Sequence, residues 1–199
     1  MPPPACHAPT ISDELGRTQE RKGVQKRHFL KRGRLAISPR GGLFAADLMS
    51  SSYTAGGELT VFLTERLGLW SSVDLTPIAL DLEEPLGRFF GESRFERGMG
   101  VLALGGLRFS PIHAKLRMGE RIVHADLYVS AGAGRLVHDS SQGVALTAGA
   151  TLELFTTSWL TLRFDLRDVA AIQEAVGQTH FAHNIVATGG LSFWLPLGW

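Results

Sequence analysis

Ten polar residues of this 199-residue chain occupy the same phase of an alternating pattern, and their types suit a dense set of ion pairs. They are Arg40, Glu58, Asp74, Arg108, His124, Asp126, Glu153, Arg163, Asp165 and Arg167. Four guanidinium groups meet five carboxylates in this set, and Arg can bind a carboxylate through two parallel hydrogen bonds. Charges removed from water must be paired, so these residues predict an internal polar network.

One further stretch, "HDSS" from His138 to Ser141, brings together residue types used in nucleophilic catalysis. A nucleophile needs its base within hydrogen-bond reach and a carboxylate to orient that base. Adjacency in the sequence does not supply this geometry, so we predict no catalytic residue and no enzyme.

The histidines do not define a metal site. His113 and His124 fall on neighbouring predicted strands, and His180 and His183 lie at the start of another. None of them combines with carboxylates at a spacing specific to metal ligands, so we predict no metal and no cofactor. The single cysteine, Cys6, excludes an intramolecular disulfide and a structural zinc site built from cysteines.

The elements that carry the polar residues alternate like strands. In "WLTLRFDLRD", Trp159 to Asp168, the even-numbered positions from Leu160 to Leu166 are apolar and the odd-numbered ones are polar. This period indicates a half-buried strand but leaves its wet face open. In a soluble sheet the leucines face the core, whereas in an outer-membrane barrel they face lipid.

Eight such segments follow Arg34, broken by turn residues. They are 34–46, 53–63, 67–80, 98–109, 121–134, 143–155, 160–169 and 183–195. At about 10–14 residues each, they suit tilted strands that cross a bilayer.

The links between these segments alternate in length. The second, fourth and sixth are compact: Thr64–Arg66, Ser110–Glu120, much of which we expect to be strand, and Thr156–Trp159. The odd-numbered links are "DLMSSS", "DLEEPLGRFFGESRFER", "RLVHDSSQ" and "AAIQEAVGQTHFA", which are looser and polar. Membrane barrels combine short periplasmic turns with longer outer loops.

The composition of the strand faces also favours a membrane barrel. The polar faces are rich in Thr, Ser, Gly and Ala, and Lys115 is the only lysine after Lys31. A soluble sheet normally exposes more Lys and Glu, whereas the interior of an eight-stranded barrel is crowded with packed side chains. Five aromatic residues near the short-turn end predict an interfacial belt: Phe62, Trp70, Phe155, Trp159 and Trp194.

The N-terminal residues 1–33 are Pro-rich, then charged, and predict a flexible basic arm. Residues 1–34 hold eight Lys/Arg against three Asp/Glu, whereas the remainder holds twelve against sixteen. Such an arm is expected to be solvated, with no nucleic-acid partner. The sequence has no apolar run long enough for a membrane helix and no signal-peptide core, which we attribute to a removed leader or a misassigned gene start.

Three stretches together resemble a known family. "IVHADLYVSAGAG", "LFTTSWLTLRFDLRD" and "HNIVATGGLSFWLP" are similar to the small outer-membrane β-barrel domain proteins abundant in myxobacteria and related bacteria, over residues 34–196. This resemblance implies an eight-stranded barrel, both termini in the periplasm, and a closing strand that is read by the barrel-assembly machinery. The chain departs from the family in ending "LGW" after Pro196 and in lacking a signal peptide.

We therefore predict an all-β protein: an eight-stranded antiparallel up-and-down transmembrane β-barrel of residues 34–199, preceded by a short periplasmic arm of residues 1–33. The expected location is the outer membrane of a Gram-negative bacterium, with membrane lipid as a partner and a periplasmic protein bound by the arm. The expected function is structural or interactive, such as anchoring an envelope complex for trafficking or gliding motility, with an interior plugged by ion pairs rather than an open pore. Two alternatives are a soluble lipocalin-like barrel that binds a ligand and an outer-membrane enzyme that modifies lipid.

Overall fold

The computed structural model describes residues 30–47, 51–78, 98–118, 121–138, 141–175 and 178–197, and every element in these ranges is a strand. The strands are β1 (Arg34–Ala45), β2 (Ser52–Phe62), β3 (Leu67–Ile78), β4 (Gly98–Met118), β5 (Arg121–His138), β6 (Ser141–Phe155), β7 (Leu160–Ala175) and β8 (Gln178–Pro196). Among these residues there is no helix long and apolar enough to cross a membrane.

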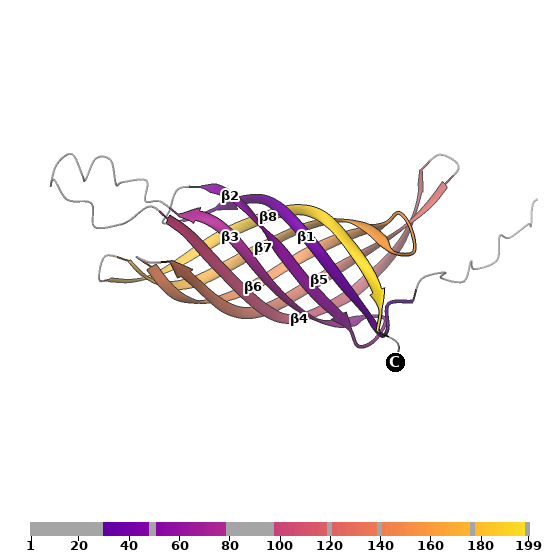
Figure 1. Ribbon diagram of the computed structural model, residues 1–199, viewed down its shortest axis with the longest axis horizontal. Helices are drawn as coiled ribbons and strands as arrows, with labels where there is room; N and C mark the ends of the chain where they lie inside the picture. The colour runs from indigo at the N-terminus through magenta and orange to yellow at the C-terminus, as the bar shows by residue number, and fades with distance from the viewer. Residues whose placement is uncertain are drawn as a thin grey trace, which may run out of the picture. The chain divides into compact units, whose positions relative to one another are not determined.

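The eight strands form one closed antiparallel barrel in sequence order, and β8 pairs with β1 to complete it (Figure 1). Following successive partners from Arg40 through β2 to β7 leads to His180 on β8, whereas the direct β8 partner of Arg40 is Gly190. The register therefore advances by ten residues around the barrel, from 180 to 190. This stagger tilts the strands relative to the barrel axis.

The predicted fold class is confirmed, but five strands, β4 to β8, are longer than predicted. β4 continues past Phe109 through a register irregularity between Phe109 and Ile112. Pro111 lies in this irregularity, and proline lacks the N–H that a regular ladder requires. Because the bulge absorbs the misfit, pairing with β5 resumes at Ile112.

The compact links are tight turns stabilised by threonine side chains. Thr64 Oγ1 accepts a hydrogen bond of 2.9 Å from the N–H of Leu67, and Thr157 Oγ1 accepts one of 3.0 Å from the N–H of Leu160. The prediction of loops at 135–142 and 170–182 is wrong, because most residues of both ranges belong to strands β5 to β8. The alternation of link lengths is therefore weaker than predicted, and the other two long links fall largely outside the described residues.

The orientation of "WLTLRFDLRD" is resolved on β7. Leu162, Phe164 and Leu166 are 39%, 53% and 57% exposed, whereas Arg163 and Asp165 are 1% and 4% exposed. The charged side chains face the barrel interior and the apolar ones face outward, which is the arrangement predicted for a membrane barrel.

The start of the barrel lies slightly earlier than the predicted boundary at residue 34. Lys31 and the residues after it belong to the same compact unit as the strands. The N–H of Arg34 donates to the carbonyl of Lys31 at 3.1 Å, and Gly33 in this turn has a φ of 68°. This left-handed backbone conformation favours glycine. The rest of the predicted arm, residues 1–29, lies outside the described residues.

Candidate functional site: the charged barrel interior

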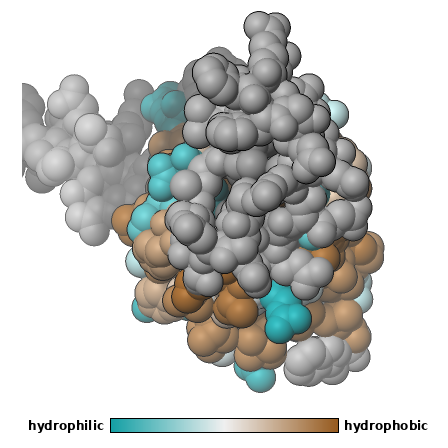
Figure 2. All heavy atoms as spheres, turned by 90° about the vertical axis from the view of Figure 1, so that its left-hand side faces the viewer, coloured by the Kyte–Doolittle hydropathy of each residue, from teal (hydrophilic) through white to brown (hydrophobic). Residues whose placement is uncertain are grey.

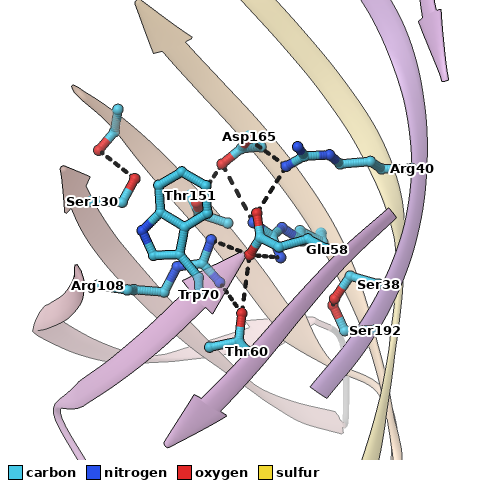
Figure 3. A network of polar contacts seen from close by, with 12 residues as sticks. Ser38, Arg40, Glu58, Thr60, Trp70, Arg108, Ser130, Thr151, Asp165 and Ser192 are labelled. Atoms are coloured by element: carbon cyan, nitrogen blue, oxygen red, sulfur yellow. Dashed lines mark hydrogen bonds and ion pairs between the residues drawn. The ribbon is translucent and has the colours of Figure 1, made fainter. Parts of the chain in front are cut away.

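A single carboxylate, that of Glu58 on β2, lies at the centre of the barrel interior (Figure 3). Four guanidinium groups contact it. Arg108 and Arg163 approach Oε1 at 2.5 and 2.8 Å, and Arg40 and Arg167 approach Oε2 at 2.8 and 3.0 Å. These arginines come from β4, β7 and β1, so the network ties distant parts of the chain together.

Two aspartates offset part of the remaining positive charge around this centre. Asp74 on β3 accepts a hydrogen bond of 2.9 Å from Nε of Arg40 and a second bond from Nη2 of the same guanidinium. Asp165 accepts from Nε of Arg167 at 2.6 Å and from the hydroxyl of Thr151 at 2.5 Å. Each aspartate therefore has a bidentate or multiple contact, the geometry that makes a buried ion pair tolerable.

Small residues beside the arginines make room for them. A Cβ atom on Gly149 of β6 would lie 2.6 Å from Cβ of Arg167 on the neighbouring strand, and one on Gly190 would lie 3.0 Å from Cβ of Arg40. Real Cβ atoms do not approach each other as closely as 2.6 Å, and at Gly190 an added Cβ atom would also lie 2.2 Å from the carbonyl oxygen of Pro39, so glycine is required where these arginine stems pass.

Trp70 of β3 covers one side of the network. The guanidinium of Arg167 lies 5.0 Å from the centre of its ring, within cation–π distance. The indole N–H donates to the carbonyl of Leu107 at 3.0 Å, so the buried ring has no unpaired polar group.

A second charged cluster closes the end of the barrel that holds the tight turns. Lys31 is fully buried there, with Nζ donating to Asp126 Oδ2 at 2.9 Å and to the hydroxyl of Tyr128 at 3.2 Å. Nζ also lies 4.7 Å from the ring centre of Tyr128 and 5.4 Å from that of Phe62. On the other side of Asp126, Oδ1 lies 2.7 Å from Nδ1 of His113.

The carboxylate of Glu65 in the β2–β3 turn holds the backbone that precedes β1. Oε2 of Glu65 accepts from the N–H of Lys31 at 3.1 Å, and Oε1 accepts from the N–H of Arg32 at 3.0 Å. Lys31 therefore enters the barrel from a fixed backbone position. The sequence analysis did not predict the burial of Lys31, because Lys31 lies in a charged stretch that was assigned to the arm.

The opposite end of the interior is mainly apolar. Large side chains fill the lumen where β1, β3 and β5 end: Phe44, Ile78, Leu102, Leu136, Val169 and Val186. This layer was not predicted. The alternation shows that each strand has two faces of different polarity, but it does not show where along a strand the inward-facing residues change from polar to apolar.

The structure brings nine of the ten predicted network residues into the interior as buried side chains. They are Arg40, Glu58, Asp74, Arg108, Asp126, Glu153, Arg163, Asp165 and Arg167, and the tenth, His124, is half-buried. They do not form one cluster, because Asp126 belongs to the Lys31 end. Glu153 is buried between the two clusters, where it interacts electrostatically with Arg163, Arg108 and Lys31.

The predicted aromatic belt is wrong for three of its members. Phe62, Trp70 and Trp194 are at most 4% exposed and lie inside the barrel. Phe155 is half-buried and its ring packs 5.8 Å from that of Trp194. Only Trp159 is well exposed, at 54%.

The cause of this error lies in the strand phase. Phe62 is in phase with Glu58, and Trp194 is in phase with Ser192, which is also buried. The prediction placed the aromatic residues at the correct end of the strands and ignored the alternation that orients them.

Among the described residues, the remaining candidates form no site. His138 is buried at the end of β5, and Ser140 of the "HDSS" stretch lies outside the described residues. His183 and Asp168 form an exposed pair of 2.8 Å, and the side chain of His180 is not described. Within the described part of the chain, no group of three or more His, Cys, Asp or Glu residues could hold a metal ion.

Comparisons with known proteins find similarity only among solved structures. No protein-family model matches the chain, and neither does any curated protein sequence. A major outer membrane protein of Thermus thermophilus matches with a TM-score of 0.46 at 10% identity, covering 81% of this chain and 98% of the other. The attachment invasion locus protein Ail of Yersinia pestis matches with 0.44 at 10% identity, covering 82% and 99%.

The outer membrane protein OprG of Pseudomonas aeruginosa matches with a TM-score of 0.42 at 11% identity, covering 84% of this chain and 98% of that one. At these identities and TM-scores the three matches carry no information about the function of this chain.

Proposed function

We propose that this chain is an integral outer-membrane β-barrel of a Gram-negative bacterium, with a structural or interaction role and no enzymatic activity. The observation that carries the proposal is the inverted distribution of polarity. Leu43, Leu146 and Phe181 are 68%, 62% and 62% exposed, whereas Glu58 and Arg108 are each 1% exposed. Soluble proteins bury charged residues only rarely and seldom expose wide apolar surfaces, so lipid is the solvent that fits this wall.

The apolar wall continues around the barrel. Figure 2 shows brown hydrophobic residues along much of the rim of the described part, with hydrophilic residues scattered between them. Exposed large hydrophobic side chains come from all eight strands, including Ile37, Leu59, Leu69, Leu107, Val129, Leu152, Leu166 and Leu191. A continuous band of this kind supports lipid on every side, rather than a single protein interface on one face.

The interior supports a closed barrel rather than an open pore. The Lys31 cluster, the ion pairs around Glu58 and the apolar layer around Phe44 follow one another along the lumen. Eight strands leave an interior just wide enough for side chains to fill. The same packing disfavours the lipocalin-like alternative, which needs an internal ligand cavity.

We also propose a specific role for the barrel in the membrane. We place both termini of the chain in the periplasm. The basic arm of residues 1–33 would contact a periplasmic protein there. The closing strand β8 would be the signal that the barrel-assembly machinery reads. An anchor of an envelope complex for trafficking or gliding motility fits such an arrangement.

Two measurements on the purified protein test this proposal. A membrane barrel should require detergent to stay monomeric and should migrate differently in SDS gels before and after boiling. In planar bilayers the folded protein should show no conductance steps at neutral pH. Stable monomers in plain buffer would refute the membrane assignment, and regular conductance steps would refute the closed interior.

A further inference from the structure

The carboxylate of Glu153 on β6 is buried between the two charged clusters without a close partner of its own. Its side chain is 1% exposed, and among the described residues neither oxygen has a hydrogen bond within 3.5 Å or an ion pair within 4.0 Å. The hydroxyl of Tyr128 interacts with it from farther away, but that hydroxyl donates to Asp126 at 3.3 Å. A carboxylate can accept about four hydrogen bonds, and a buried one that lacks them is strongly unfavourable.

The strand neighbours of Glu153 explain why it has no close partner. Its register partner on β5 is Asp126, a like charge that binds the ammonium of Lys31 at 2.9 Å. Its register partner on β7 is Arg163, whose guanidinium turns to Glu58 at 2.8 Å and to Asp165 at 3.6 Å. The opposite charges on both sides of Glu153 are therefore bound to other carboxylates.

Two of the interior arginines have unfilled hydrogen-bond donors. The Nε atoms of Arg108 and Arg163 are buried, and no acceptor among the described residues takes their hydrogens. In contrast, Nε of Arg40 and Nε of Arg167 donate directly to aspartates at 2.9 and 2.6 Å. Arg108 and Arg163 are also the two arginines that interact electrostatically with Glu153. Unfilled donors and unfilled acceptors therefore occur together in one buried layer.

We propose that this layer is a binding site for water, and that bound water molecules bridge the carboxylate of Glu153 to the Nε–H groups of Arg108 and Arg163. Water can donate to a carboxylate and accept from a guanidinium at the same time. A metal cation would satisfy Glu153 but would be repelled by both arginines and Lys31, and an anion would be repelled by Glu153. Two hydrogen bonds of about 2.9 Å each span a gap of more than 4 Å between carboxylate and guanidinium.

These water molecules join the two charged clusters into one hydrogen-bonded unit. The Lys31 cluster covers the site on the side of the tight turns, and the mainly apolar layer around Phe44 covers the other end of the lumen. Exchange with the solvent should therefore be slow. The inference goes beyond the proposed function and does not depend on it, because the site lies inside the barrel whether lipid or water surrounds the wall.

The test is nuclear magnetic resonance on the full chain, produced with isotope-labelled arginine and refolded in detergent micelles. Rotating-frame cross-peaks between water and the Hε proton are expected for Arg108 and Arg163. Arg40 and Arg167 are internal controls and should show no such cross-peak, because their Nε–H groups donate directly to aspartates. Cross-peaks at none of the four arginines, or equal cross-peaks at all four, would overturn the proposal.

Two variants at Glu153 form a matched pair. Glu153→Leu removes the acceptor, so the cross-peaks of Arg108 and Arg163 should be lost. Glu153→Gln keeps a side-chain oxygen without the charge, so both cross-peaks should remain. Their loss in both variants would point to a cation held by the charge and would refute a water site. Their persistence in both would refute the role of Glu153. If the leucine variant does not fold, loss of the cross-peaks in Glu153→Gln alone refutes the proposal and their retention supports it.

The same samples keep this inference distinct from the proposed function. A heat-dependent shift in the SDS gel reports the folded barrel in each variant. A folded barrel that requires detergent but lacks the two cross-peaks refutes the water site alone. The two cross-peaks in a protein that stays monomeric without detergent support the water site and refute the membrane assignment.

Discussion

At the scale of single residues, the interior depends most on Glu58. Its two carboxylate oxygens contact four arginines, and it also accepts a hydrogen bond of 3.0 Å from Thr60. Arg108 has no other ion pair within 4 Å among the described residues, so without the Glu58 charge that guanidinium would depend on weaker interactions with Glu153 and Asp165.

Glu58→Gln should therefore destabilise the folded barrel by about 3–5 kcal/mol, the cost of breaking a buried ion pair by removing one partner. The measurement is the free energy of unfolding from urea titration in lipid vesicles, followed by Trp fluorescence. Ser38→Ala is the control, since it removes one neutral buried hydrogen bond of 2.7 Å to Ser192 and should cost about 1 kcal/mol. An equal loss in both variants would contradict the central role of Glu58.

Lys31 makes a similar prediction at the end of the barrel. Lys31→Met leaves the buried carboxylate of Asp126 without its ammonium partner, and a loss of about 3–5 kcal/mol is expected. Arg32→Met is the matched control, because its side chain is exposed and its backbone contact to Glu65 is retained. If both variants unfold at the same urea concentration as the parent protein, Lys31 is not an anchor of the fold.

At the scale of the strands, the alternation carried most of the predictable information. On β7 it assigned Arg163, Asp165 and Arg167 to one face and the apolar residues to the other, because side chains alternate across every strand. The same rule would have placed Phe62 inside with Glu58. That prediction failed because the position along the strand was used without its phase.

Other features could not be derived from local patterns. The bulge between Phe109 and Ile112 depends on how β5 continues past Pro111, which is a property of two strands. The burial of Lys31 depends on Asp126 and Tyr128, which lie about a hundred residues away. Neither the bulge nor the burial of Lys31 leaves a periodic signal in the sequence.

The close packing of neighbouring strands gives a prediction at this scale. Gly149→Ala adds a Cβ atom 2.6 Å from both Cβ of Arg167 and the carbonyl oxygen of Leu166. We expect a loss of about 1–3 kcal/mol from overpacking. At Gly189 the nearest atoms to an added Cβ lie at 3.9 Å, so Gly189→Ala should have little effect in the same urea titration. Equal stability of the two variants would show that β6 and β7 can move apart.

At the scale of the whole barrel, the structure is polar inside and apolar outside. The described interior holds three successive layers of buried side chains, and the wall presents exposed leucine, valine, isoleucine and phenylalanine side chains. These features fit the proposed arrangement, in which lipid replaces water as the outer solvent and the charges pair with one another within the lumen.

The free energy of unfolding of Leu166→Arg in lipid bilayers tests this account most directly. Leu166 is 57% exposed near the middle of β7, so a charge there should cost about 2–4 kcal/mol if the wall faces lipid. Leu197→Arg, just past the end of β8, is the depth control and should cost no more than about 1 kcal/mol. Unchanged stability of Leu166→Arg, in a protein that stays monomeric without detergent, would contradict the account, because an exposed arginine costs little in water.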